Sequence, residues 1–257
     1  MYLVTCKNER NSLELAKNAA AYLKANNVKC VLGKEASLSM HDFESTGIEM
    51  IVAIGDDHFI LETFRTIGKQ QIPVFAISPF QSFFAQANSL NFKYYFDLIK
   101  KKKYEIFRRS RLVAKFGKTT TPIGLNDIGL FSSKSASLLK YSLFLNDEVF
   151  WKDTSDGIVA STPTGSTGYS LSAGGPIVLD EPNIFTLTPI SSLEKHSSVI
   201  VSDGTKIKLT GIEGHKPVMV IDGDIRMPLN AKEVLIGKSP YDANFVIFSK
   251  EYALESR

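Results

Sequence analysis

Apolar residues in roughly the first hundred positions of the chain form two patterns that alternate. Short continuous apolar runs, typical of strands buried on both faces, are followed by segments in which apolar residues recur at helical spacing. The first such segment carries apolar residues from Leu13 to Leu23, and Ser12 is predicted to cap its helix. This alternation predicts a parallel sheet with helices on its faces. The predicted strands are 2–5, 28–32, 48–54 and 72–77, and a second helix is predicted at 59–67.

A different pattern begins near Lys103. Short runs rich in β-branched and aromatic residues follow one another, separated by Gly, Asn, Asp and Pro, which is typical of an antiparallel all-β unit. The consecutive lysines at 100–103 are interpreted as a solvent-exposed face or linker at the boundary. The predicted strands of this second part lie within 104–116, 123–131, 138–150, 157–161, 199–201, 205–210, 218–221 and 233–236.

The composition narrows the class of protein without giving a function. Of 257 residues, 44% are hydrophobic and 22% are charged, which argues against disorder. The net charge of +3 is too small to indicate a nucleic-acid partner, and no apolar run reaches the roughly 18–20 residues that cross a bilayer. The N-terminus lacks the features of a signal peptide, and Cys6 and Cys30 have no metal-site spacing. We therefore expect a cytoplasmic protein with neither a nucleic-acid nor a membrane partner.

The segment 156–176 carries the strongest chemical signal. It is predicted to form a strand, then a turn rich in glycine and hydroxyl groups, T-P-T-G-S-T-G-Y at 162–169, and then the start of a short helix. Such a turn offers free backbone N–H groups and several hydroxyls, which suit a ligand with ribose hydroxyls and phosphates. Tyr169 could stack on a flat base. The alternative interpretation is a well-capped strand-to-helix turn.

A second candidate, Gly55-Asp56-Asp57-His58, directly follows a predicted buried strand. Ligands of open α/β sheets lie beyond the carboxyl ends of strands, where two carboxylates could hold Mg²⁺ or accept a proton from a hydroxyl. The alternative is a polar turn in which Asp caps the next helix. The pairs Asn126-Asp127 and Asp222-Gly223, each taken alone, are interpreted as turns.

Several better-known sites are excluded by their motifs. The chain has neither the G-x-x-x-x-G-K-[ST] phosphate loop nor the G-x-G-x-x-G dinucleotide turn. Ser166 lacks the spacing of a nucleophile elbow, and neither H-E-x-x-H nor C-x-x-C occurs.

Taken together, the motifs resemble those of the NAD kinases, which phosphorylate the 2′-hydroxyl on the adenosine ribose of NAD. The segment 156–176 is close to the family signature D-G-hydrophobic-x-x-x-T-P-T-G-S-T-A-Y, with Gly168 in place of Ala. Leu125-Asn126-Asp127 resembles the family motif L-N-E/D, and Val220-Ile221-Asp222-Gly223 resembles its later D-G-Q motif.

The resemblance implies an α/β + all-β architecture. It consists of a Rossmann-like parallel-sheet domain at 1–103, an antiparallel β-sandwich domain that binds NAD at 104–240, and a segment at 241–257 that returns to the first domain. It also implies ATP or polyphosphate as phosphate donor, Mg²⁺ as cofactor, and a homodimer or homotetramer.

The resemblance also implies a role for individual residues. Asp57 is the expected catalytic base, and Gly55, Asp56 and His58 are expected to contact the phosphate donor. Separately from the resemblance, Asp56 is expected to be an additional metal contact peculiar to this chain. Asn126 and Asp127 are expected to bind ribose or base, and Asp156 another polar end of NAD. Thr164 and Tyr169 are expected to frame the adenine, and Thr167 and Gly168 to line the pocket. Ser172 completes the expected NAD-binding set.

The departures from the family pattern lie mainly in the N-terminal half. The family turn G-G-D-G-T is here Gly55-Asp56-Asp57-His58-Phe59, and the stretch G-I-N-x-G-x-x-G-F is here A-I-S-P-F-Q-S-F-F at 76–84. The segment 189–196 keeps P-I but lacks the following C-P-H. Two alternatives to an NAD kinase follow. One is a non-catalytic NAD(P)-binding relative that acts as a sensor or subunit, and the other is a kinase of the wider superfamily acting on a lipid or sugar.

Overall fold

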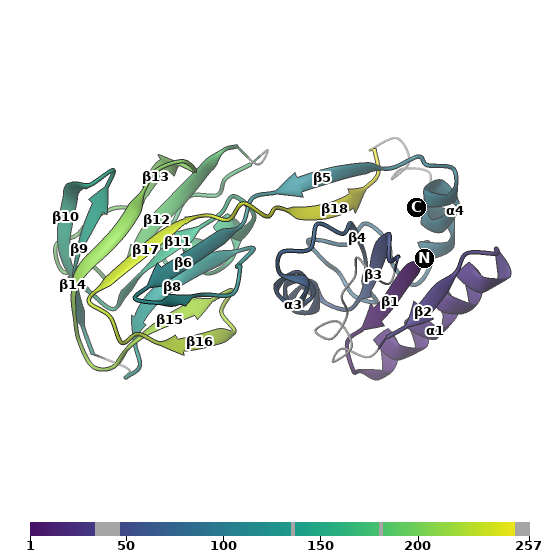
Figure 1. Cartoon of the computed structure of the whole chain (residues 1–257), viewed down its shortest axis with the longest axis horizontal. Helices are drawn as coiled ribbons and strands as arrows, with labels where there is room; N and C mark the ends of the chain where they lie inside the picture. Colours follow the sequence, from purple (N-terminus) through teal and green to yellow (C-terminus); the bar gives the residue numbers. More distant parts are fainter. Residues whose placement is uncertain (34–46, 135–136, 180–181, 250–257) are drawn as a thin grey trace. The chain divides into compact units, whose positions relative to one another are not determined.

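The computed structural model describes residues 1–33, 47–134, 137–179 and 182–249. These residues form two compact units (Figure 1). The first unit contains the described residues up to Arg108 and those at 243–249, and the second runs from Arg109 to Asp242.

The first unit is built on one six-stranded sheet with the strand order β2-β1-β3-β4-β18-β5. The neighbouring pairs from β2 through β18 are all parallel, as the alternation of strands and helices predicts. Its elements are β1 (Tyr2–Cys6), α1 (Arg10–Ala25), β2 (Cys30–Leu32), β3 (Met50–Ile54), α3 (Asp57–Ile67), β4 (Val74–Ile77), α4 (Phe92–Lys100), β5 (Glu105–Arg109) and β18 (Ala243–Ile247).

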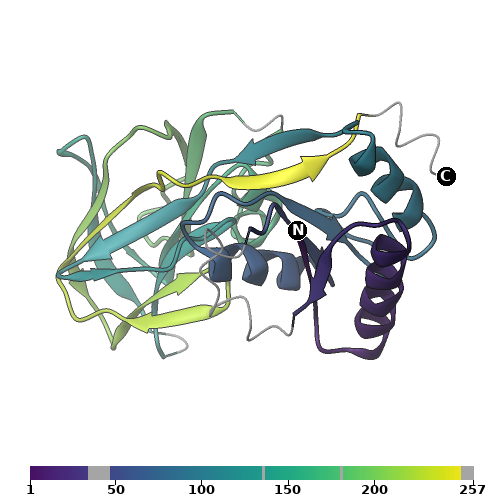
Figure 2. The same ribbon diagram turned by 45° about the vertical axis from the view of Figure 1, so that its right-hand side comes forward.

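Strand β3 is buried along its whole length because helices cover both faces of the sheet. Helices α1 and α4 contribute to one core cluster with alternate residues of β1, β3 and β4. Helix α3 lies on the other face, where Phe64 packs against Phe245 of β18 with 4.5 Å between ring centroids. Figure 2 shows α1 and α4 on their side of the sheet. Because β1, β3 and β4 are parallel neighbours, their carboxyl ends lie at the same edge of the sheet.

The second unit contains two six-stranded sheets, ordered β10-β9-β14-β17-β6-β7 and β13-β12-β11-β8-β15-β16, with every pairing antiparallel. The strands are β6 (Leu112–Phe116), β7 (Thr119–Thr120), β8 (Asp127–Ser132), β9 (Leu139–Leu145), β10 (Glu148–Ser155), β11 (Gly157–Ser161), β12 (Ile184–Ile190), β13 (Val199–Ser202), β14 (Ile207–Glu213), β15 (Pro217–Ile221), β16 (Ile225–Pro228) and β17 (Glu233–Lys238). Two short helical segments, η2 (Thr164–Thr167) and α5 (Tyr169–Ser172), follow β11.

Residues from both sheets form one hydrophobic core in this unit. Alternate residues point inward, as Leu139, Tyr141 and Leu143 do along β9, which is the arrangement of a β-sandwich. The expected fold class, a parallel-sheet unit joined to an antiparallel one, is thus confirmed. None of the helices in the described part of the chain is long and apolar enough to cross a membrane.

The structure differs from the sequence-based expectation in several places. Strand β5 belongs to the first sheet, and the compact units divide at 108/109 and 242/243, whereas the expected divisions were 103/104 and 240/241. Ser12 is not the helix cap: α1 begins at Arg10, and the Ser12 hydroxyl donates to Glu9 Oε1. Strand β18 pairs with β4 in the first unit, and residues 250–257 of the expected returning segment lie outside the described residues.

Candidate functional site

The turn at 162–169 leaves the end of β11 and is fixed by hydrogen bonds to the segment before β8. The Thr162 hydroxyl donates to the Leu125 carbonyl (2.6 Å), and the Thr162 amide donates to the Asn126 carbonyl (2.9 Å). The same hydroxyl accepts from the Gly165 amide at 3.1 Å. Strands β8 and β11 are neighbours, with Asp127 opposite Ser161, so the pairing brings the two motifs together. The structure therefore joins T-P-T-G-S-T-G-Y and L-N-D into one surface.

Gly165 makes this close approach possible. A Cβ at Gly165 would lie 2.1 Å from the Asn126 carbonyl oxygen, a distance that no side chain can adopt. At Gly168 the nearest atom to a Cβ would be the Gly165 oxygen at 3.3 Å, and the Asn126 side-chain Nδ2 would be 3.9 Å away. The backbone of the turn thus packs directly on Asn126, while Gly168 has room for an alanine after a small adjustment.

Asp222 is a further residue of this site, to which sequence reasoning assigned no role. Its buried carboxylate accepts hydrogen bonds from the amides of Leu125 (3.2 Å), Asn126 (2.7 Å) and Asp127 (3.3 Å). The Asp222 amide in turn donates to the Asp127 carbonyl. Asp222 therefore fixes the backbone that carries both expected NAD-binding side chains. The available signal was the D-G sequence at 222–223, which resembles the family's D-G-Q motif and which, taken alone, is interpreted as a turn.

Two polar groups on this backbone have no hydrogen-bond partner among the described residues. One is the Asn126 Oδ1 atom, which is shielded from solvent and accepts no hydrogen bond from this part of the chain. The Asp127 side chain is 7% exposed and makes no hydrogen bond to any other described residue. Burial, with a smaller contribution from the negative charge of Asp222, raises the pKa of Asp127 to about 7. Because unsatisfied buried polar groups are costly, they mark a place where a polar ligand can compensate.

The raised pKa of Asp127 predicts a pH-dependent stability. The folded-state pKa of about 7 exceeds the value near 3.9 of an unfolded chain, so the stabilising contribution is complete below pH ~4 and is lost as the pH rises toward 7. Between pH 5 and 8 the chain should lose on the order of 2 kcal/mol relative to Asp127→Asn, which cannot ionise. Urea denaturation of both proteins at pH 5, 6.5 and 8 measures this difference. Equal pH dependence in the two proteins would contradict it.

The remaining expected NAD-binding residues of the turn differ in accessibility. Thr164 is buried, and its hydroxyl accepts from Arg109 Nη1 at 3.3 Å. Thr167, Tyr169 and Ser172 are exposed on the outer side of the turn, and Gly168 is half-buried between them. The Tyr169 ring is 48% exposed and lies edge-on to Phe131, with 5.8 Å between centroids. It thus presents one aromatic surface to solvent beside the polar turn.

Asp156 lies away from the residues of the 162–169 turn. It is exposed and precedes Gly157, at the opposite end of β11 from Thr162. At about 3.3 Å per strand residue, the two ends are on the order of 15–20 Å apart. Its contact with NAD stays a prediction.

In the first unit, Asp57 opens α3 at the carboxyl edge of the sheet. Its carboxylate accepts hydrogen bonds from the Ser82 hydroxyl and from the amides of Phe83 (3.0 Å) and Phe84 (3.4 Å). These donors belong to the loop that follows β4, so the expected catalytic base also orients that loop.

Asp56 is the N-cap of α3, as the alternative interpretation of this turn had it. Asp56 Oδ1 accepts from the Phe59 amide at 3.0 Å, and Oδ2 is 2.5 Å from Lys7 Nζ. Burial opposes ionisation of Asp56, but the hydrogen bonds from Lys7 and Phe59 outweigh it and hold the pKa below its ordinary value. Both oxygens are thus occupied, and a metal ion at Asp56 would have to share them with Lys7 or Phe59.

The other residues of the turn have different surroundings. Gly55 is buried, and a Cβ there would lie 2.8 Å from the Phe59 side chain, whereas His58 is exposed. Among the residues that the structure describes, no three His, Cys, Asp or Glu side chains are grouped so that they could hold a metal ion.

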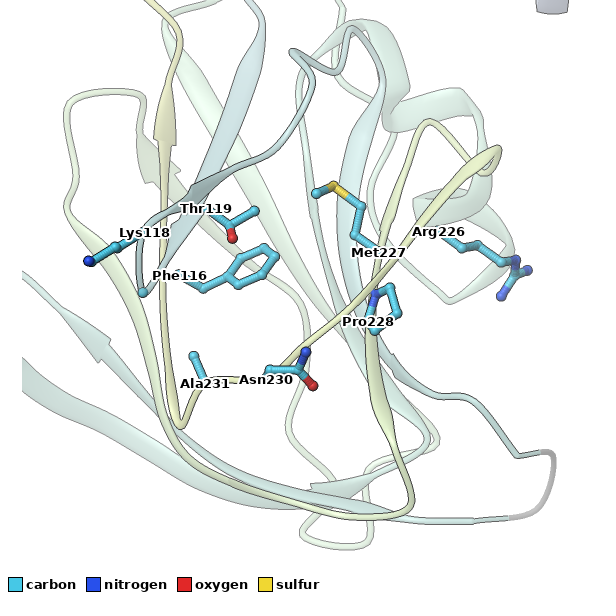
Figure 3. A pocket seen from close by; sticks show the side chains of 9 residues that line it. Phe116, Lys118, Thr119, Arg226, Met227, Pro228, Asn230 and Ala231 are labelled. Carbon is cyan, nitrogen blue, oxygen red and sulfur yellow. The ribbon is translucent and has the colours of Figure 1, made fainter.

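Cavity shape alone does not identify the site. A hollow of about 370 Å³ lies between the β6–β7 turn and β16, lined by Phe116, Met227 and Pro228 among others (Figure 3). None of the residues that the sequence singled out lines it.

Comparison with known proteins identifies the family. The family model of the ATP-NAD kinase C-terminal domain matches residues 125–248. A bifunctional NADP phosphatase/NAD kinase of Methanocaldococcus jannaschii is 34% identical over 256 residues, covering 95% of this chain and 44% of that protein. An NAD kinase of Clostridium botulinum (strain Loch Maree / Type A3) is 30% identical over 226 residues, covering 84% of this chain and 79% of that one.

Solved structures agree with this assignment. An NAD kinase from Archaeoglobus fulgidus in complex with ATP superposes with a TM-score of 0.80 at 25% identity, over 99% of this chain and 96% of that one. Yeast NADH kinase complexed with NADH has the same fold, with a TM-score of 0.85 at 21% identity, over 99% of this chain and 85% of that one. The matched motifs, the relatives and the fold lead to one conclusion: this chain belongs to the NAD kinase family.

Proposed function

We propose that this protein is an NAD kinase that transfers a phosphoryl group from ATP or polyphosphate to the 2′-hydroxyl on the adenosine ribose of NAD. The observation that carries the proposal is the buried, unsatisfied Oδ1 of Asn126 beside the 162–169 turn. An oxygen acceptor in this place suits a hydroxyl or amino donor, which the ribose and the adenine of NAD both supply. The family relationship supports the same substrate.

In the proposed binding mode, NAD lies on the second unit. Asn126 and Asp127 bind its ribose or base, Tyr169 stacks on the adenine, and Thr164, Thr167, Gly168 and Ser172 line the surface around it. The exposed ring of Tyr169 and the hydroxyls of the turn support this arrangement. Asp222 contributes indirectly by holding the Asn126–Asp127 backbone.

In the proposed reaction, the 2′-oxygen attacks the terminal phosphorus of the donor, and its proton passes to the Asp57 carboxylate. The bond between that phosphorus and the bridging oxygen breaks, so ATP leaves as ADP and the product is NADP. Phosphoryl transfer depends mainly on positioning and on charge neutralisation. Mg²⁺ bound to the donor phosphates would supply part of this neutralisation, since Mg²⁺ usually binds through substrate phosphates and few protein carboxylates.

A non-catalytic NAD(P)-binding role is the second candidate, and one observation favours it. The Asp57 carboxylate is already hydrogen-bonded to Ser82 and to the Phe83 and Phe84 amides, so at least one of these bonds must give way or be shared during catalysis. We favour the kinase because a carboxylate oxygen has more than one lone pair. We also propose that the chain forms a homodimer or homotetramer, as the family resemblance implies.

Formation of NADP tests the proposed function. Incubation with NAD, Mg²⁺ and either ATP or polyphosphate should yield NADP, which an NADP-specific dehydrogenase detects. NAD binding without NADP formation from either donor would favour the non-catalytic role instead.

A further inference from the structure

The order of the strands in the first unit marks one place on its sheet edge. From β1 the chain crosses to β2 on one side and later places β3 and β4 on the other side, so the order reads β2-β1-β3-β4. The direction of winding therefore changes between β1 and β3. Ligands of open α/β sheets bind at such a switch point, in the crevice outside the carboxyl ends of the strands.

Lys7 and Asp56 are the residues that stand at this switch point. Lys7 directly follows β1, and its amide donates to the Ile54 carbonyl at the end of β3. Asp56 follows Gly55 at the end of β3. The two side chains meet across the switch point with 2.5 Å between Lys7 Nζ and Asp56 Oδ2. A second carboxylate, that of Glu9, lies 3.6 Å from Lys7 Nζ.

The ammonium group of Lys7 is held in place by Asp56 and still has N–H donors for another partner. Its side chain is 36% exposed, and it donates one hydrogen bond, to Asp56. An ammonium group has three N–H donors, so Lys7 can still donate to a ligand oxygen. The hydrogen bond to Asp56 is the main cause of a raised pKa at Lys7, so the group stays protonated at neutral pH.

From this geometry we infer that the Lys7 ammonium group binds the phosphate chain of the donor as its cationic anchor. Asp56 is the positioning residue that holds this ammonium group in place. The inference rests on the proposed function, because it assigns the donor to the first unit. Lysine binds phosphate as a point charge, so its position decides its effect. Without Lys7, the edge would present Asp56, Asp57 and Glu9 to a polyanion and would repel it.

The test compares donor binding in four variants of the full chain. Lys7→Met removes the charge, Lys7→Arg keeps it, and Lys7→Met/Asp56→Asn removes both partners. Lys17→Met is the matched control, since Lys17 is an exposed lysine on α1 with no ion pair among the described residues. Calorimetry with Mg²⁺-ATP and, in a separate arm, with polyphosphate gives the dissociation constant of each donor. Calorimetry with NAD and the KM values for both substrates are measured in parallel.

We expect Lys7→Met to raise the dissociation constant for Mg²⁺-ATP by about tenfold or more, while that for NAD changes less than about twofold. Lys7→Arg should restore most of the affinity. The double variant should bind the donor better than Lys7→Met, because the repelling carboxylate is gone. A shift with ATP alone or with polyphosphate alone would identify which donor the anchor serves.

Three results would overturn the inference: unchanged donor affinity in Lys7→Met, equal loss of NAD and donor affinity, or failure of the original chain to bind either donor. Failure of the proposed function has a different signature. In that case the unmodified chain binds the donor, and Lys7→Met weakens this binding, yet no NADP forms.

Discussion

Asp57→Asn is expected to lower kcat for NADP formation by about 10²-fold or more while the dissociation constant for NAD stays within about twofold. The substitution removes the proposed proton acceptor for the 2′-hydroxyl. It keeps an amide oxygen in the place of the carboxylate oxygen that accepts from the Phe83 amide, so the loop after β4 can keep its conformation. Steady-state kinetics with saturating NAD and donor, together with NAD calorimetry, measure the two quantities.

Asp97→Asn is the matched control for this prediction. Asp97 is a carboxylate of α4 in the same unit that accepts from the Tyr22 hydroxyl and belongs to none of the proposed sites. It should leave kcat unchanged. Full turnover in Asp57→Asn would show that Asp57 is not the base.

Gly165→Ala is expected to destabilise the second unit and to disrupt NAD binding. The added Cβ would lie 2.1 Å from the Asn126 carbonyl oxygen and 2.5 Å from its carbon, and both atoms belong to the backbone that Asp222 holds. The turn must therefore move away from Asn126. We expect a loss of about 3 kcal/mol or more in the free energy of unfolding and at least about a tenfold rise in the dissociation constant for NAD.

The second glycine of the same turn provides the control. Gly168→Ala adds the same atom, but its nearest neighbour would be the Gly165 oxygen at 3.3 Å. Urea denaturation and NAD calorimetry should show little change in either quantity. Equal effects of the two substitutions would mean that the packing of the turn on Asn126 does not control the site.

The hydrophobic pattern of the sequence predicted those strands in which every residue is buried. Strand β11 has the predicted bounds because five consecutive residues are buried, and β3 lies within the predicted run for the same reason. Strand β12 was not among the predicted strands. It lies between β11 and β13 and pairs Pro189 with Ile158, although proline is unusual inside a central strand. Helix α4 was missed although Phe92, Tyr95, Phe96 and Ile99 have helical spacing.

The sequence predicted those parts of the candidate site that are formed by a continuous motif. The 162–169 turn and Asn126-Asp127 could be identified, and strand pairing explains why they meet. The D-G sequence marks Asp222, but its carboxylate accepts from amides 95 to 97 residues away, and a local motif does not identify such distant partners. The Lys7–Asp56 pair spans 49 residues and depends on β1 and β3 being neighbours, which a strand prediction alone does not establish.

The most direct measurement follows the phosphoryl group itself. The chain is incubated with NAD, Mg²⁺ and ATP labelled in its terminal phosphate, and the products are separated and identified. We expect the label to enter the 2′-phosphate of NADP in step with ADP formation. Unlabelled polyphosphate is tested as the competing donor. Two results would contradict the proposed phosphoryl transfer. In one, the label is released as free phosphate. In the other, the label stays in ATP, NAD is unchanged, and polyphosphate gives no NADP either.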